Sequence, residues 1–314
     1  MYTKRTWTDY RINIRRRRLV FVAIALFVAG MVSAASIHFA GRLKGSLRGV
    51  RKELLEFWDS GAFDEVFSRS QAALASRPMD YFLLTMHGFS AYQMGISQIN
   101  SLNAAQYFDD CVRSLRKAML LKNAEQDGQL FYVLGKAYRY KGESFADLSV
   151  RYLEKARELP FAAADIPQYL GIAYAAIGDY RSSVAAYADA LGSLGESGVS
   201  SLLLLEIARS YLALGEFDAA RAYLLRCIEI SADSRAIMEA RLLLAEVLRN
   251  AGDNTGARQQ LQIVLEETGD NAEVHYQLGE LYALQGDTIR ARAEWRLALR
   301  ADPAHIKART RLSI

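Results

Sequence analysis

A glycine recurs along most of this chain at nearly regular intervals. The positions are Gly61, Gly95, Gly142, Gly178, Gly215, Gly252 and Gly286, and the intervals are 34, 47, 36, 37, 37 and 34 residues. A small residue stands seven positions before six of these glycines, at Gly88, Gly135, Gly171, Ala208, Ala245 and Gly279, whereas Leu54 holds that place before the first. A self-similar period of this length indicates an array of short supersecondary units stacked on one another. The chain is therefore predicted to be a stack of repeats.

Each unit is predicted to be a pair of helices joined at its glycine. Ala, Leu and Arg are abundant and only 4 Pro occur in 314 residues, a composition that favours helix. Small residues recur in the second helix, where they permit close approach: Ala73, Ala118, Ala156, Ala190 and Ala298. Pro78, Pro160 and Pro303 fall where second helices are predicted to end, because proline cannot continue a helix.

The last unit carries the clearest motif. It reads AEVHYQLGELYALQGDTIRARAEWRLALRADPAH over Ala272–His305, with Leu278-Gly279, Gly286-Asp287 and Asp302-Pro303 at characteristic places. This segment resembles the tetratricopeptide repeat (TPR), a 34-residue helix–turn–helix unit. The resemblance implies an all-α, right-handed α-solenoid of about seven helix pairs over residues 47–305, followed by a capping helix over 306–314.

The second unit departs from this plan. About eleven extra residues lie within Ile96–Tyr107, between its glycine and its second helix. A lengthened helix and a projecting loop are both compatible with the insertion.

The N-terminal region predicts a membrane anchor. Residues 19–41 are uncharged for 23 residues, and a helix of that length spans a bilayer core of roughly 30 Å. Residues 1–52 hold 12 Lys and Arg against one acid, Asp9, and four of these arginines immediately precede the apolar segment. Basic flanks remain in the cytoplasm. We therefore expect a basic cytoplasmic tail (1–18), a single transmembrane helix or signal anchor (19–41), a linker (42–46), and a C-terminal domain in the periplasm of a bacterial inner-membrane protein.

Two alternatives for this segment stay open. Val32-Ser33-Ala34 fits the small-residue pattern of a cleaved signal peptide, and a buried helix of a soluble protein is the other. The long basic region before the segment and the apolar residues beyond the cleavage pattern favour the uncleaved anchor.

Several function classes are disfavoured by composition. Residues 53–314 hold 27 basic and 34 acidic residues, so a basic nucleic-acid-binding face is not expected. The 2 Cys and 4 His are too scattered for a disulfide framework or a metal site. No phosphate-loop motif and no converging acid, base and nucleophile are evident. We predict a protein that is not an enzyme and carries no cofactor or metal.

The family resemblance implies a binding groove along the first helix of each repeat, at its second, fifth, ninth and twelfth positions or their neighbours. Carried over to repeats 2 to 4, it implies partner-binding residues at Phe82, Phe89, Tyr92, Tyr132, Lys136, Arg139, Tyr140 and Tyr169. Aromatic and arginine side chains are frequent anchors of protein interfaces. Repeats 6 and 7 present Glu246, Glu273 and Glu280 instead. We expect Lys136 and Arg139 to be exposed; core packing of the tyrosines is the alternative interpretation.

The predicted function is a membrane-anchored scaffold or adaptor. It would bind a protein or peptide partner in the concave groove and support assembly of a complex in the bacterial envelope, as the resemblance implies. A periplasmic small-ligand-binding component of a transporter is the alternative. A compact pocket would favour the small-ligand role, and an open groove of standard interface size would favour the scaffold.

Overall fold

The computed structural model describes residues 48–194 and 198–313, and within these ranges all regular structure is helical, with no strand. Helical residues 48–59 come first. They are followed by α2 (Phe63–Ser76), α3 (Tyr81–Ser97), α4 (Ser101–Ala118), the short η1 (Lys122–Ala124), α5 (Gly128–Tyr140), the short η2 (Glu143–Phe145), α6 (Ala146–Glu158), α7 (Ile166–Ala176), α8 (Tyr180–Leu194), α9 (Ser201–Leu214), α10 (Phe217–Ile230), α11 (Ser234–Asn250), α12 (Asn254–Thr268), α13 (Ala272–Leu284), α14 (Thr288–Ala301) and α15 (Ile306–Leu312).

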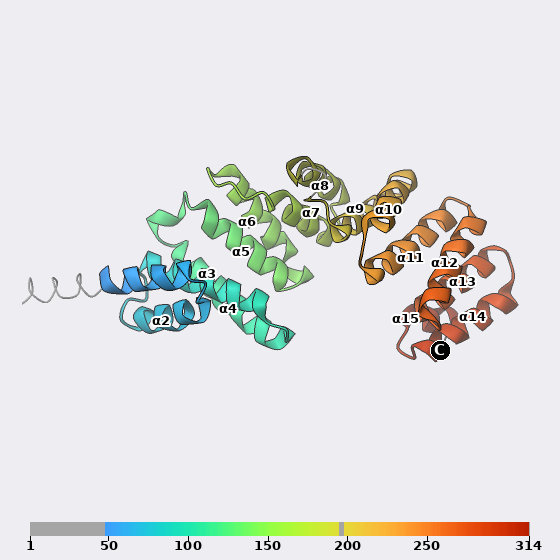
Figure 1. Ribbon diagram of the computed structural model, residues 1–314, viewed down its shortest axis with the longest axis horizontal. Coiled ribbons are helices and arrows are strands. Elements are labelled where there is room, and N and C mark those ends of the chain that lie inside the picture. Colours follow the sequence, from blue (N-terminus) through green and yellow to red (C-terminus); the bar gives the residue numbers. More distant parts are fainter. Residues whose placement is uncertain (1–47, 195–197, 314) are drawn as a thin grey trace, which may run out of the picture.

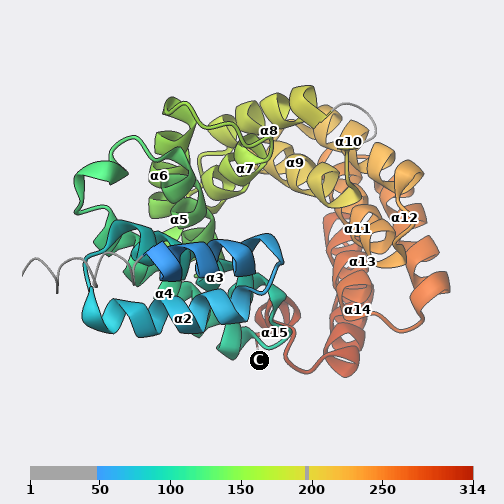
Figure 2. The ribbon, with the colours of Figure 1, turned by 60° about the vertical axis from the view of Figure 1, so that its left-hand side comes forward.

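The helices stack as successive pairs. Residues 48–59 and α2 form the first pair, α3 and α4 the second, and so on to α13 and α14. Each pair packs on the next along the chain. Figure 1 shows the resulting elongated array, and Figure 2 shows that it curves into an arc with α5, α7, α9 and α11 on its inner side. The predicted all-α repeat solenoid is confirmed.

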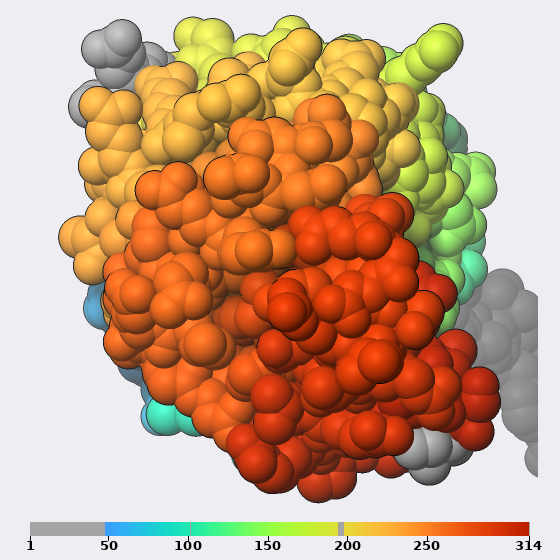
Figure 3. Space-filling model, turned by 90° about the vertical axis from the view of Figure 1, so that its right-hand side faces the viewer, coloured from blue at the N-terminus to red at the C-terminus, as the bar shows by residue number. Residues whose placement is uncertain are grey.

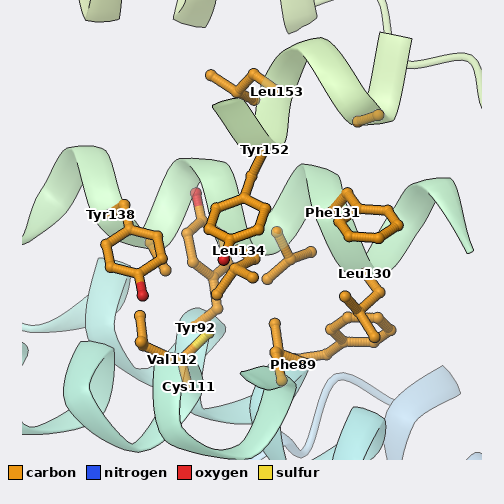
Figure 4. Packing of buried hydrophobic residues seen from close by; sticks show 14 of the residues in the cluster. Phe89, Tyr92, Cys111, Val112, Leu130, Phe131, Leu134, Tyr138, Tyr152 and Leu153 are labelled. Carbon is orange, nitrogen blue, oxygen red and sulfur yellow. The ribbon is translucent and has the colours of Figure 1, made fainter. Parts of the chain in front are cut away.

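Small residues in the first helix of a pair allow the second helix to approach closely. A Cβ at Gly88 would lie 2.5 Å from Leu115, and one at Gly135 would lie 2.7 Å from Leu153. The core between neighbouring pairs is built from aliphatic and aromatic side chains, among them Leu134 and Tyr152 (Figure 4). Cys111 and Cys227 are both buried and form no disulfide.

The turn glycines adopt the backbone conformation that their spacing predicts, with one exception. Six of them have positive φ: Gly61, Gly142, Gly178, Gly215, Gly252 and Gly286. Gly95 is instead helical, because α3 continues to Ser97. A Cβ at Gly95 would lie 2.7 Å from the ring of Phe108 on α4. The prediction of a turn at Gly95 is therefore wrong, and this glycine permits close helix packing.

The insertion in the second pair lengthens both of its helices. Helix α3 has 17 residues and α4 has 18, compared with 13 each in α5 and α6. The Asn100 side chain caps α4 by accepting a hydrogen bond from the Leu102 amide at 2.9 Å. The sequence was compatible with a lengthened helix and with a projecting loop, and the structure has lengthened helices.

The two ends of the array differ in what the structure describes. The predicted tail, transmembrane helix and linker all lie outside the described residues. Within 48–194 and 198–313, no helix is both long and apolar enough to cross a membrane. At the other end, α15 packs on α14 through Ala308 and Leu312. Figure 3 shows the surface at this end of the array, where the orange and red C-terminal parts of the chain adjoin.

Candidate functional site

A pocket of about 750 Å³ lies between the end of α5, the length of α7 and the start of α9. These helices are on the inner side of the arc (Figure 2). Five lining residues occupy groove positions of the repeat: Arg139, Gln168, Ile172, Leu202 and Arg209. The pocket therefore coincides with the groove that the resemblance implies, and it is centred one repeat further along the chain than the predicted residues.

Exposed apolar side chains line this pocket. Leu202, near the start of α9, is 64% exposed, and Tyr140 at the end of α5 is also exposed. One face of the Tyr140 ring stacks on Phe108, with centroids 4.9 Å apart, which holds the ring in place. Large apolar groups that remain in solvent on a concave surface are typical of binding sites.

Arg139 supplies an accessible positive charge beside Tyr140. Its guanidinium carbon lies 5.0 Å from the centre of the Tyr140 ring, and the side chain is exposed. No carboxylate lies within ion-pair distance of it in the described part of the chain, whereas Arg209, across the pocket, pairs with Glu239. Arg139 is thus positioned by an aromatic ring and available to an acidic group.

The lining of the pocket also includes a buried tyrosine. Tyr187 of α8 lines it and is 1% exposed, and its hydroxyl makes no hydrogen bond of normal geometry with any described residue. Burial, followed by the nearby Glu206 carboxylate, raises the pKa of Tyr187. The nearby Ser183 side chain acts in the opposite direction on this pKa, and the hydroxyl is shielded from the space of the pocket.

Lys136 occupies a different environment from the one expected. It is 8% exposed, and its ammonium group donates hydrogen bonds to Asp165 at 2.9 Å and to the Tyr132 hydroxyl at 2.7 Å. The rings of Tyr132 and Tyr169 flank it, with centroids 4.6 and 4.2 Å from Nζ. The expectation that Lys136 is exposed is wrong, because Asp165 at the start of α7 neutralises it.

The same contacts affect the tyrosines around Lys136. Burial raises the pKa of Tyr132 to about 12; the hydrogen bond from Lys136 acts in the opposite direction, and Asp165 reinforces the rise. The Tyr132 hydroxyl donates to both oxygens of Asp165, at 2.7 and 2.8 Å. Tyr132, Lys136 and Tyr169 therefore form a closed polar cluster that connects α5 to α7.

The aromatic residues of α3 lie mostly in the core. Phe89 and Tyr92 are buried, and their packing is visible in Figure 4. Phe82 is half-buried near the N-terminal end, with the Arg51 guanidinium 5.1 Å from its ring centre. The structure brings Tyr92, Tyr132, Lys136, Tyr140 and Tyr169 together, and it leaves Phe82 and Phe89 in the packing around the first pair.

Two of the three predicted acidic groove residues, Glu273 and Glu280, contact α15 or the residue before it. Arg311 donates two hydrogen bonds to Glu280, at 2.8 and 2.6 Å. His305 lies 3.1 Å from Glu273, and Lys307 lies 3.9 Å from the same carboxylate. The opposite charges that the sequence placed at the two ends of the groove are therefore weakened by contacts within the chain.

Sequence reasoning missed three residues of this region: Asp165, Tyr187 and Glu206. Asp165 stands six residues before Gly171, as Phe82 does before Gly88, so it does occupy a groove position, whereas Tyr187 lies on a second helix. For Tyr187, the sequence signal is on the partner residue. Gly171 is one of the recurring small residues, and it leaves the space that the Tyr187 ring fills.

Comparison with known protein families identifies repeats in two segments of the C-terminal half of the chain. Residues 203–234 and 242–306 each match a family model described as tetratricopeptide repeat. Together they include most of α9 to α14. The chain therefore contains tetratricopeptide repeats, as the motif in Ala272–His305 predicts. No curated protein sequence matches the chain.

Solved structures share the fold at low sequence identity. The C-terminal part of a TPR repeat-containing protein from Cytophaga hutchinsonii is 14% identical, with a TM-score of 0.56, covering 82% of this chain and 97% of that one. PilW, described as a widely conserved type IV pilus biogenesis factor, is 16% identical, with a TM-score of 0.55, covering 72% and 98%. A tetratricopeptide repeat protein from Parabacteroides merdae is 16% identical, with a TM-score of 0.51, covering 85% and 97%.

Proposed function

We propose that this array of tetratricopeptide repeats is a scaffold that binds a segment of a partner protein across α5, α7 and α9. The observation that carries the proposal is the set of exposed side chains on the inner side of the arc, where Tyr140 and Leu202 lie beside the available guanidinium of Arg139. Apolar anchors together with an arginine are frequent at the centres of protein interfaces.

The pocket indicates the chemistry of the partner segment. Leu202 and Ile172 offer apolar surface, so the segment would place an aliphatic or aromatic side chain against them. Arg139 would bind an acidic side chain, because a guanidinium pairs well with a carboxylate. Lys136 takes no direct part, since its charge is already compensated by Asp165.

We further propose that the scaffold acts in the bacterial envelope. Residues 19–41 would anchor it in the inner membrane and leave the repeats in the periplasm, where the partner would belong to an envelope complex. The apolar length of the segment and its basic flank support this placement. The shared fold with a pilus biogenesis factor is compatible with such a role.

Partner capture tests the groove. The full chain is used to capture proteins from detergent-solubilised membranes, and the bound proteins are identified by mass spectrometry. Arg139→Glu combined with Leu202→Asp should weaken binding of the captured partner by about tenfold to a hundredfold. The matched control is Arg292→Glu with Leu225→Asp, two exposed positions outside the pocket. Equal capture by both double variants would exclude the pocket as the partner site.

A reporter fusion tests the location separately. A reporter that is active only outside the cytoplasm, fused after Ile314, should be active, and the purified protein should retain its N-terminus. Recovery of a chain that begins at Ala35 would instead show cleavage of the segment and a periplasmic protein without an anchor.

The size of the pocket also supports the small-ligand alternative. Its volume falls within the roughly 300–1,000 Å³ of sites that hold small molecules, and the Tyr187 ring forms part of its wall. Screening small polar and zwitterionic compounds by thermal shift distinguishes the two functions. A compound that stabilises the parent chain would favour this alternative over the scaffold.

A further inference from the structure

The hairpin between α3 and α4 ends in an exposed apolar tip, formed by Ile96, Ile99 and Leu102. Ile99 is fully exposed, Leu102 is 79% exposed, and Ile96 is 46% exposed. The turn between them is held by the Asn100 cap on α4 and by a hydrogen bond from the Gln98 amide to the Gly95 carbonyl at 3.3 Å. The three aliphatic side chains are therefore presented to solvent by a well-defined turn.

The apolar tip also differs from the other turns in charge. The turns that join the other helix pairs carry a charged residue within two positions of their glycine: Asp59, Lys141, Asp179, Glu216, Asp253 and Asp287. By contrast, residues 81–108 contain no Asp, Glu, Lys or Arg. The uncharged stretch covers the whole of α3, the turn and the first part of α4.

The apolar tip joins two long helices. Helices α3 and α4 have 17 and 18 residues and exceed the helices of the next pair by 4 and 5 residues, respectively, and Figure 1 shows them near the N-terminal end of the array. Phe108 of α4 packs closely on Gly95, beside the tip, and holds the two helices together there. Ile96, Ile99 and Leu102 do not line the pocket between α5, α7 and α9, so the tip is a separate surface.

We propose that the apolar tip inserts into the interfacial zone of a lipid bilayer. The tip presents aliphatic side chains alone, because Phe108 is buried and Tyr107 packs edge-on against Phe67 at 5.4 Å, and aliphatic side chains partition favourably into a bilayer. Charged groups strongly oppose insertion, and residues 81–108 contain no Asp, Glu, Lys or Arg. The small polar residues between the aliphatic ones suit the headgroup region.

This inference concerns a surface outside the groove and goes beyond the partner-binding function. A shallow contact through three side chains would be weak and reversible, since even one acyl chain gives only marginal membrane binding. It would orient the repeats only where residues 19–41 already hold the chain at the membrane, so its effect in the cell rests on the proposed anchor. The test must therefore distinguish insertion of the apolar tip from anchoring by residues 19–41.

A fluorescent label at the tip provides that test. Both native cysteines are buried, so an environment-sensitive dye can be attached selectively to Ile99→Cys in the full chain, reconstituted with vesicles of phosphatidylcholine and phosphatidylglycerol. The matched control is Ile289→Cys, 82% exposed beside the last turn glycine. We expect a blue-shifted emission at position 99, most of which is lost when the acyl chains carry a nitroxide quencher. Emission at position 289 should stay unshifted and unquenched.

Flotation of the vesicles reports independently on residues 19–41. A chain that floats while its label at position 99 stays in water overturns the tip proposal and leaves the anchor standing. A chain that does not float and shows no shift overturns both. A blue shift that appears without lipid as protein concentration rises identifies self-association and also overturns the proposal. Adding Leu102→Ser should reduce the quenching at position 99, and unchanged quenching would contradict insertion of the tip.

Discussion

Lys136 and Arg139 are close on α5 but have different surroundings. Lys136 is enclosed by tyrosine rings and paired with Asp165, whereas Arg139 is exposed and rests on the Tyr140 ring. Charge alone therefore does not identify a binding residue in this groove. The residue that can meet a partner is the one whose charge is left uncompensated by the fold.

Substitutions at these two positions should separate stability from binding. Lys136→Met should lower the free energy of unfolding by about 1–3 kcal/mol, because it leaves the Asp165 carboxylate and the Tyr132 hydroxyl without their partner; this is less than for a fully buried pair, since Asp165 is partly exposed. Arg139→Met should change it by less than about 0.5 kcal/mol and should weaken partner binding. Chemical denaturation of both variants checks this, and equal losses of stability would contradict it.

The buried His87 should make stability depend on pH. Burial lowers the pKa of His87, so the unfolded chain binds a proton more readily than the folded chain. The stability contributed by neutral His87 is complete above its ordinary pKa of about 6.5 and declines as pH falls below that value. The melting temperature should therefore drop from pH 7.5 to pH 5.5 by more in the parent than in His87→Leu. His275, which lies between Asp270 and Glu294, is present in both proteins and serves as the common background.

At the scale of single elements, α3 shows how an insertion changes the role of a glycine that keeps its place in the repeat. Gly95 keeps its position relative to Gly88, yet the extra residues continue as helix and move the turn to residues 98–100. The glycine then serves the contact with Phe108 on α4. A glycine inside a helix is intrinsically unfavourable. At position 95 the close packing against Phe108 requires a residue without a side chain.

Alanine at two helical glycines tests this difference. Gly95→Ala should destabilise by about 1–3 kcal/mol, because its methyl group meets the Phe108 ring. Gly192→Ala on α8 should instead stabilise by up to about 1 kcal/mol, since nothing lies within 4 Å of a Cβ there and alanine favours helix. Thermal unfolding of the two variants gives the comparison. A stabilising Gly95→Ala would show that α4 can shift to accommodate the methyl group.

The whole molecule is a curved stack in which each pair contacts mainly its neighbours. Such an array should not respond uniformly to damage, because its stability is approximately a sum of repeat and interface contributions. The pair α9–α10 lies inside the array, and α13–α14 has only α15 beyond it (Figure 1).

Equivalent turn substitutions should therefore have different consequences. Gly215→Val and Gly286→Val each force a β-branched residue into positive φ, near 76° and 78°, at about 1–3 kcal/mol. Hydrogen exchange should rise in α13 to α15 alone for Gly286→Val, and on both sides of the α9–α10 turn for Gly215→Val. Identical, complete loss of helix in both variants would argue against a solenoid with local stability.

The sequence by itself determined the repeating architecture. The turns at Gly215 and Gly286 and the close helix packing at Gly88 and Gly135 follow from glycines that recur at fixed places in the repeat. These features are local: each depends on a residue's own conformational freedom or size and on a period that the chain repeats. A single sequence is enough to read them.

Only the tertiary structure decided which groove residues are available. Asp165 reaches Lys136 from the next repeat, Arg311 of α15 covers Glu280, and Tyr187 comes from a second helix to line the pocket. The sequence therefore predicted the groove and several of its residues but misassigned Lys136. The physical reason is that these contacts join side chains about one repeat apart or more, and their geometry depends on how successive pairs pack. The repeat period predicts where each helix lies along the chain, but it does not predict which side chains of different repeats contact each other.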